Sequence, residues 1–180
     1  FVFSGSLEAW QIPDRVAALM EALHSISPQF HLLLLTRDTD KGRQVFGRLI
    51  ERGACTLESA PFDQVPDFLA AADVALLLRE RDAVNRVASP VKFAEYLISG
   101  LPVIATPDLG DVSSYLDTTG HEILVALEPP TAEQAARIAG ALERDAWRGC
   151  REAISRRAVE HFSRESYRDL YRQIFRRLDI

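Results

Sequence analysis

The sequence has 180 residues, 47% of them hydrophobic and 26% charged, which is the composition of one ordinary globular domain or at most two. The formal net charge of −5 argues against a nucleic-acid-binding protein that is held by bulk electrostatics. The two cysteines, Cys55 and Cys150, are too few for a disulfide scaffold and have no metal-ligand spacing, so we expect a reducing compartment and no metal.

The start of the chain, FVFSGS, has neither a methionine nor a signal peptide before the first strand-like run. No apolar run in the sequence approaches the roughly 18 residues that a membrane helix needs. We therefore expect a domain cut from a longer, cytoplasmic protein.

Apolar strand-like runs alternate with helical patterns along most of the chain. The runs are FVF (1–3), FHLLLLT (30–36), ACTLESA (54–60), DVALLL (73–78), LPVIAT (101–106) and EILVAL (122–127). The helical patterns cover 13–27, 40–53, 64–72, 90–99, 111–117 and 132–144, with Gly53 and Gly100 as helix ends. This alternation predicts an α/β fold, a doubly wound, Rossmann-like parallel sheet of about six strands with helices on both faces.

The strand pattern ends at residue 146, and residues 147–180 read as a helical extension. We expect two parts, a Rossmann-like domain over 1–146 and C-terminal helices over 147–180 that pack on it or on a missing N-terminal domain. Ser163 is expected to cap the last helix, which is apolar on one face. Residues 144–180 hold ten arginines against six acidic residues. We expect a solvated arginine face, with peripheral contact to an anionic membrane as the alternative.

Candidate ligand-binding residues follow the strand-like runs, because ligands of an open parallel sheet bind beyond the carboxyl ends of its strands. Glycine, hydroxyl and arginine residues at this edge suit a phosphate-bearing ligand. Taken singly, each is better explained as a plain turn or a solvated side chain than as a ligand contact. The segments are Ser4-Gly5-Ser6, Thr36-Arg37-Asp38, Pro61-Phe62, Arg79-Glu80-Arg81 and Thr106-Pro107.

The segment ASPVKFAEYLISGLPVIATP (88–107) places a lysine where a helix begins. Ser89 fits an N-cap and Pro90 the first helical position, so Lys92 falls at the third, beside the positive end of the helix dipole. That position costs a lysine roughly 0.3–1 kcal/mol, and a bound anion would reverse the sign. Local physics leaves open whether Lys92 binds an anion or bends into solvent.

Glu95 lies three residues after Lys92, on the same side of the predicted helix. Its carboxylate is suited to accept hydrogen bonds from two hydroxyls, as a ribose diol requires. An ion pair between Glu95 and Lys92 is the alternative.

Residues 89–106 resemble the donor-site segment of retaining glycosyltransferases with the two-domain GT-B fold, particularly the family 4 group. The match is to a Ser-Pro-x-Lys-x-x-Glu-Tyr-Leu variant, at Ser89, Pro90, Lys92, Glu95, Tyr96 and Leu97. FVFSGSLEAW is similar to the strand and glycine loop that open the family's C-terminal domain. APFDQVPDFLAAADVALLL resembles its nucleobase segment, and HFSRESYRDLYRQIFRRL resembles its terminal helices, so the resemblance covers nearly the whole chain.

The resemblance implies a nucleotide-sugar site. Glu95 would hold the ribose hydroxyls, and the loop of Gly5 and Ser6 would lie near the diphosphate and the donor sugar. Ser89 and Lys92 would bind the diphosphate, and Pro61 and Phe62 would meet the nucleobase.

The sequence departs from the family pattern in two places. Val87 stands eight residues before Glu95, where the family has its first glutamate, usually placed at the donor sugar. The stretch from Ser6 to Gln11 lacks the two basic residues, an arginine and a lysine, that many relatives use to bind the diphosphate. Arg37, Arg79, Arg81 or Arg86 could take the place of these basic residues, and the sequence does not choose among the four.

The resemblance therefore implies the donor-binding half of an enzyme that transfers a sugar from a nucleoside-diphosphate sugar to an unknown acceptor, with retention. We expect this half alone to be inactive, to need no cofactor and to bind no nucleic acid. The intact protein would be cytoplasmic or peripheral at the inner face of a membrane. The alternatives are a nucleotide-sugar epimerase and a degenerate, non-catalytic nucleotide-binding or interaction module.

Overall fold

The computed structural model of the chain describes residues 1–119, 123–124, 132–143 and 148–177. Its strands are β1 (Val2–Ser4), β2 (Leu32–Leu35), β3 (Cys55–Glu58), β4 (Ala75–Leu77), β5 (Val103–Ala105) and β6 (Ile123–Leu124). Its α-helices are α1 (Pro13–Ile26), α2 (Thr39–Glu51), α3 (Val65–Ala70), α4 (Val91–Ile98), α5 (Gly110–Thr119), α6 (Ala132–Glu143), α7 (Arg151–Phe162) and α8 (Arg164–Arg177).

The strands form one parallel sheet in the order β3-β2-β1-β4-β5-β6. Five strands have three or four residues, and the sheet is extended by the two-residue β6. The chain builds outward from β1 to β3 and then returns to β4 on the other side of β1, which is the doubly wound arrangement. The predicted fold class is confirmed. Of the predicted run over 122–127, the residues other than 123 and 124 lie outside the described residues.

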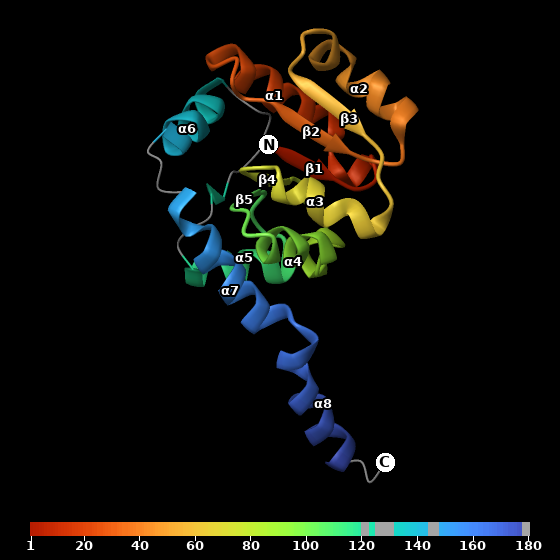
Figure 1. Ribbon diagram of the computed structural model, residues 1–180, viewed down its shortest axis with the longest axis vertical. Helices are drawn as coiled ribbons and strands as arrows, with labels where there is room; N and C mark the ends of the chain where they lie inside the picture. The colour runs from red at the N-terminus through yellow and green to blue at the C-terminus, as the bar shows by residue number, and fades with distance from the viewer. Residues whose placement is uncertain (120–122, 125–131, 144–147, 178–180) are drawn as a thin grey trace.

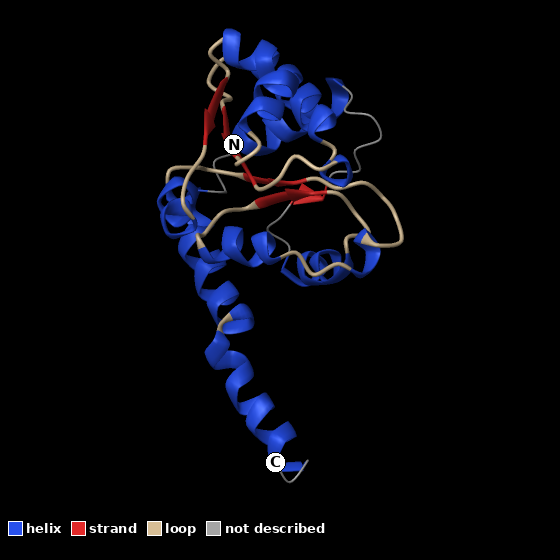
Figure 2. Cartoon of the chain, turned by 90° about the vertical axis from the view of Figure 1, so that its right-hand side faces the viewer, coloured by secondary structure: helices blue, strands red, loops and turns tan. Residues whose placement is uncertain are grey.

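Helices cover both faces of the sheet, as Figures 1 and 2 show. Helices α1, α2 and α6 bury their apolar stripes on one face, and α3, α4, α5 and α7 bury theirs on the other. The strands contribute alternate residues to the two cores, so that Phe3 faces the first core and Val2 the second. Burial on both faces explains why the strand-like runs are apolar throughout.

The predicted helix ends are confirmed at three positions. Gly53 and Gly100 follow α2 and α4 with φ angles of 69° and 75°, a backbone region that glycine adopts without strain. At the start of α8, the Ser163 hydroxyl accepts a hydrogen bond from the Ser166 amide at 3.2 Å, as an N-cap does.

Helix α7 packs against α4, and Arg151 at its start holds the ends of two other helices. The Arg151 guanidinium donates hydrogen bonds to the carbonyl groups of Ala72 (2.7 Å), Ala70 (3.3 Å) and Ser99 (3.5 Å). These carbonyls lie at the carboxyl ends of α3 and α4, where helical carbonyls lack partners of their own. The arginine therefore fixes the helix that carries Lys92 to its neighbours.

Helix α8 runs away from the sheet and the other helices (Figure 1). Its aromatic residues Tyr167, Tyr171 and Phe175 have 40%, 57% and 51% of their surface exposed. An amphipathic helix with an exposed apolar face lacks the burial that usually stabilises it. None of the described helices combines the length and the apolar character that crossing a bilayer requires.

Candidate functional site

The carboxyl ends of β1 and β4 lie side by side at the point where the strand order reverses. In an open parallel sheet, ligands bind in the crevice at this switch point. The segments that follow the two strands begin with Gly5 after β1 and reach Arg79 two residues after β4. Helix α4, with Lys92 and Glu95, follows next in the chain.

Gly5 makes room for Lys92. A methyl group on Gly5 would lie 2.5 Å from the Lys92 Nζ atom and 3.2 Å from its Cε atom. The φ angle of Gly5 is 128°, which side-chain-bearing residues rarely adopt. Its amide donates a hydrogen bond to the Leu35 carbonyl at 2.9 Å, which fixes the loop to the end of β2. The loop therefore requires glycine for both its backbone angle and the space beside it.

Lys92 is turned toward the loop after β1 and is partly buried there. Its ammonium donates a hydrogen bond to Gln11 Oε1 and lies 5.2 Å from the centre of the Phe3 ring. Gln11 in turn donates from Nε2 to the Ser6 hydroxyl at 2.7 Å. The hydrogen-bond partner of the ammonium is thus a neutral amide, and no carboxylate forms an ion pair with it among the described residues.

The pKa of Lys92 is lowered to about 7. Burial is the main cause, the charge of Arg79 lowers the pKa further, and Glu95 acts in the opposite direction. A buried ammonium loses hydration, which disfavours its charged form. A bound anion would restore the protonated state.

The predicted start of α4 is wrong by one residue. Ser89 is exposed and does not cap the helix, and Pro90 is the flanking residue instead, with extended backbone angles of −71° and 120°. Because Pro90 is extended, the helix begins at Val91 and Lys92 occupies its second position. No side chain caps this helix, so its first amide groups remain free of side-chain acceptors.

Tyr96 joins α4 to the end of β1. Its fully buried hydroxyl accepts a hydrogen bond from the Ser4 amide at 2.9 Å and lies 3.4 Å from the Ser4 carbonyl, to which it donates. Burial raises the pKa of the tyrosine, so the hydroxyl stays protonated and serves both bonds. Lys92 lies about one helical turn before Tyr96 on α4, so the bonds between Tyr96 and Ser4 also hold the Lys92 ammonium beside Gly5.

Arg79 is a second cation beside Lys92, and only 9% of its surface is exposed. Its guanidinium carbon lies 4.5 Å from the centre of the Trp10 ring, and Nη1 donates to Asn85 Oδ1 at 3.2 Å. The buried Nε has no hydrogen-bond partner in the described part of the chain. Burial lowers the pKa of the guanidinium, while the negative charge of Asp82 acts to raise it.

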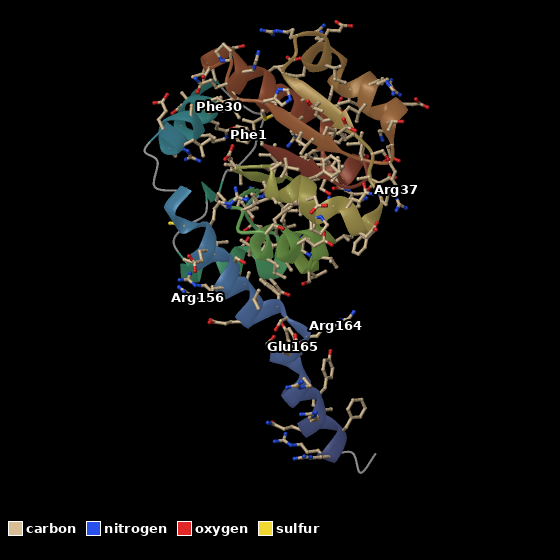
Figure 3. All side chains as sticks on the ribbon, in the orientation of Figure 1. Phe1, Phe30, Arg37, Arg156, Arg164 and Glu165 are labelled. Carbon is tan, nitrogen blue, oxygen red and sulfur yellow. The ribbon has the colours of Figure 1, made fainter. Side chains whose placement is uncertain are left out.

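The other three arginines that the sequence left open have different surroundings. Arg37 is exposed at the end of β2, at the edge that Figure 3 shows near α3. Arg81 forms an ion pair with Asp108, and Arg86 is exposed. Of the four arginines, Arg79 is the one whose charge acts on Lys92.

A cavity of about 460 Å³ lies over the ends of β1 and β2. Gly5, Ser6, Arg37 and Phe62 contribute to its wall, together with other residues of the same loops. Phe62, with 74% of its surface exposed, follows the exposed Pro61 and offers an aromatic face at the mouth. An exposed aromatic side chain beside a cavity is suited to stack on a planar ligand group.

A second cavity of about 480 Å³ lies at the opposite, amino edge of the strands. Phe1 and Phe30, labelled in Figure 3, form part of its wall and contact each other edge to face. Gly5 does not line this cavity. Because ligands of open parallel sheets bind at the carboxyl edge, we assign the site to the cavity beside Gly5.

Glu95 lies partly buried on α4, one turn after Lys92. No ion pair joins these two residues in the part of the chain that the structure describes. Val87 lies at the end of a short 3₁₀ turn (Asn85–Val87) with 82% of its surface exposed. An exposed valine contributes little to folding, so folding does not account for a valine at this position.

The sequence did not identify Gln11 or the double hydrogen bond of Tyr96. Gln11 lies in the stretch where the family resemblance calls for a basic residue. The missing basic residue was the sequence feature that could have drawn attention to it. The buried hydroxyl of Tyr96 gave no signal beyond the motif match, since its partner Ser4 lies 92 residues away in the chain.

No family model and no curated protein matches the chain. Solved structures do resemble it, WaaG, TarM and HepE among them. WaaG, a glycosyltransferase involved in lipopolysaccharide biosynthesis, is 21% identical with a TM-score of 0.66 over 89% of this chain and 43% of its own. TarM is 14% identical with a TM-score of 0.73 over 97% of this chain and 34% of its own. HepE of Anabaena, crystallised with UDP, is 18% identical with a TM-score of 0.71 over 99% of this chain and 48% of its own.

These similarities show that the chain has the GT-B fold of one part of these solved chains, as the family resemblance implied. The chain spans less than half the length of each of the three solved chains. The remaining part of those chains has no counterpart in the 180 residues.

Proposed function

We propose that the chain is the donor-binding half of a glycosyltransferase that transfers a sugar from a nucleoside-diphosphate sugar to an acceptor, with retention. The fold it shares with solved glycosyltransferases supports this proposal, and one of them, HepE, was crystallised with UDP. The residues at the carboxyl edge of the sheet support it independently.

The observation that carries the proposal is the contact between Lys92 and the Gly5 loop. A partly buried ammonium with a neutral amide as partner is poorly stabilised, and it lies beside the uncapped start of α4. Helix amides and an ammonium that converge on one place form an anion site. The absence of a side chain on Gly5 lets a phosphate approach the backbone closely.

The residues around Lys92 would bind the other parts of the nucleotide. The partly buried Glu95 would accept hydrogen bonds from the two ribose hydroxyls, and the exposed Phe62 would stack on the base. Ser6 and Ser89 supply hydroxyl groups near the diphosphate. When the sugar leaves, charge accumulates on the diphosphate, and Lys92 and the helix amides stabilise it there without a metal.

Transfer also needs an acceptor, which we assign to the rest of a longer protein, because the chain spans less than half of the solved glycosyltransferases it resembles. The exposed aromatic face of α8 is suited to pack on that missing N-terminal domain. The chain alone is therefore expected to bind nucleotide and to transfer no sugar. Sugar transfer by the isolated 180 residues would contradict this assignment.

The proposal is tested by calorimetric titration of the chain with UDP, GDP, dTDP, ADP and their sugars. Lys92→Ala should weaken the best ligand at least about 10-fold, because a charge-assisted contact to phosphate is lost. Glu95→Ala should weaken the nucleotide and the matching nucleoside alike, since both carry the ribose. If neither variant weakens the best ligand, the site is wrongly placed. Equal binding with and without EDTA is expected of a metal-free site.

A non-catalytic nucleotide-binding module is the second candidate, and Val87 favours it. This valine is highly exposed at the position where the family resemblance calls for a glutamate at the donor sugar. The module would bind a nucleoside diphosphate no more weakly than its sugar, and the longer protein would not transfer the sugar. Tighter binding of a nucleotide sugar than of its nucleoside diphosphate would exclude this candidate.

A further inference from the structure

Arg79 is a buried cation whose hydrogen-bonding capacity is only partly used. Its exposed fraction is 9%, and its Nε has no partner in the described part of the chain. Buried polar atoms in proteins are nearly always paired, so an unpaired guanidinium nitrogen calls for an explanation. A ligand that accepts its hydrogen bond is one such explanation.

Three contacts hold Arg79 in place before any ligand arrives. The guanidinium stacks on Trp10 at 4.5 Å, Nη1 bonds to Asn85, and the backbone amide donates to the Thr106 hydroxyl at 3.2 Å. Asn85 is itself anchored, because its side-chain amide donates to the Glu80 carbonyl at 2.9 Å. The side chain is therefore preorganised, and binding would need little further ordering of it.

Arg79 and Lys92 are neighbouring cations, and neither forms an ion pair with a carboxylate among the described residues. Arg79 lowers the pKa of Lys92, which is the signature of like charges close together. Asp82 lies near Arg79 and raises its pKa, but its carboxylate accepts the Asn85 amide at 2.6 Å, and no ion pair joins it to Arg79 within the described residues. An anion between the two cations would relieve their repulsion.

Trp10 connects Arg79 to the loop that carries Gly5. Trp10 and Gln11 are adjacent in this loop, so the loop contacts Arg79 through one residue and Lys92 through the next. The Trp10 carbonyl also accepts a hydrogen bond from the Glu80 amide at 2.9 Å, which ties the loop to the segment after β4. The two cations thus contact adjacent residues of one loop, and the loop itself contains no basic residue.

We propose that Arg79 is a second diphosphate-binding group, which together with Lys92 supplies the positive charge that the loop after β1 lacks. This inference rests on the proposed function. It assigns the role to Arg79 among the four arginines, Arg37 included, that the sequence left open. Guanidinium suits this position because it stacks flat on an indole while its N–H groups bind phosphate oxygens in pairs.

The test compares UDP, or whichever nucleoside diphosphate the wild-type chain binds best, with the matching nucleoside. Arg79→Gln should weaken the diphosphate at least about 10-fold, as expected for loss of a charge-assisted contact, and leave the nucleoside within about 2-fold. Arg79→Lys keeps the charge but loses the stacking, and should fall between the wild type and Arg79→Gln. Arg48→Gln, on the exposed face of α2, removes the same charge far from the site and should change neither affinity.

The outcomes separate this inference from the proposed function. If Lys92→Ala loses diphosphate affinity while Arg79→Gln keeps it, the role of Arg79 is refuted and the proposed function stands. A loss with Arg37→Gln and none with Arg79→Gln would refute it in the same way. Equal loss of diphosphate and nucleoside with Arg79→Gln would show a structural role only. If the wild-type chain binds no nucleoside diphosphate, both proposals fall. If Arg79→Gln fails to fold, Arg79→Lys decides by the same comparison.

Discussion

Gly5 and Lys92 fit against each other so closely that a single added methyl group would lie 2.5 Å from the Lys92 Nζ atom. The two residues are 87 positions apart and come from the loop after β1 and from α4. The site therefore depends on both the backbone angle of the glycine and the position of the lysine side chain.

Gly5→Ala should damage the site and the fold together. The φ angle of 128° is strained for alanine by about 1–3 kcal/mol, and the methyl group must displace the Lys92 ammonium. We expect a lower free energy of unfolding by urea and weaker nucleotide binding. Gly47→Ala is the matched control, since Gly47 lies within α2 with no atom within 4 Å of an added Cβ. It should stabilise the chain by about 0.5–1 kcal/mol. Equal effects of the two substitutions would contradict this account of Gly5.

Tyr96→Phe should destabilise the chain by about 1–3 kcal/mol, because the Ser4 amide loses its buried hydrogen-bond partner. Chemical denaturation measures this change. Tyr171→Phe removes the same hydroxyl from a side chain with 57% of its surface exposed and should change stability by less than about 0.5 kcal/mol. A neutral Tyr96→Phe variant would show that the hydroxyl does not hold α4 to β1.

The stability of the chain should rise with pH through the range in which Lys92 titrates. Its pKa is lowered from 10.5 to about 7 in the folded state, so between these values the unfolded chain binds the extra proton. Stability then increases with pH, by at most about 1.4 kcal/mol per pH unit. Lys92→Met removes the buried charge and should be more stable than the wild type at pH 6, with a smaller advantage at pH 9. The difference between the two unfolding curves isolates Lys92 from other groups, and an advantage that grows with pH would contradict the assignment.

Nucleotide binding should weaken as the pH rises above 7. A diphosphate favours the charged ammonium, so binding above this pH must take up a proton on Lys92. The affinity should fall by up to about 10-fold per pH unit, and Lys92→Met should lose this dependence. Calorimetry in buffers of different ionisation enthalpy measures the proton uptake directly. Binding without proton uptake at pH 8 would place the phosphates away from Lys92.

The fold was predictable because its signals are local. Apolar runs flanked by helical patterns predicted each strand, and Gly53 and Gly100 predicted two helix ends. The runs were longer than the strands, since residues such as Leu101 are buried beside a strand without belonging to it. The start of α4 was placed wrongly because Ser89 and Pro90 satisfy the capping pattern in sequence, whereas the extended backbone of Pro90 delays the helix by one residue.

The candidate site was predictable only where its residues share one helix. Helical spacing placed Lys92 and Glu95 on one side of α4. The partner of Lys92 is Gln11, 81 residues away in the chain, and no local pattern connects the two. The choice of Arg79 among four arginines likewise depends on its contacts with Trp10 and Asn85, which only the folded chain brings together.

The contacts of Arg151 bear on the order in which the chain folds. Its guanidinium reaches carbonyl groups of Ala70, Ala72 and Ser99, which precede it by up to 81 residues. The three carbonyl groups come together only after α3 and α4 have formed and their carboxyl ends lie side by side. Closing so long a segment carries an entropic penalty, so we expect α7 to dock late, on a sheet that is already assembled. A nascent chain that has not yet emerged beyond residue 151 would hold α4, with Lys92 and Glu95, without this lock.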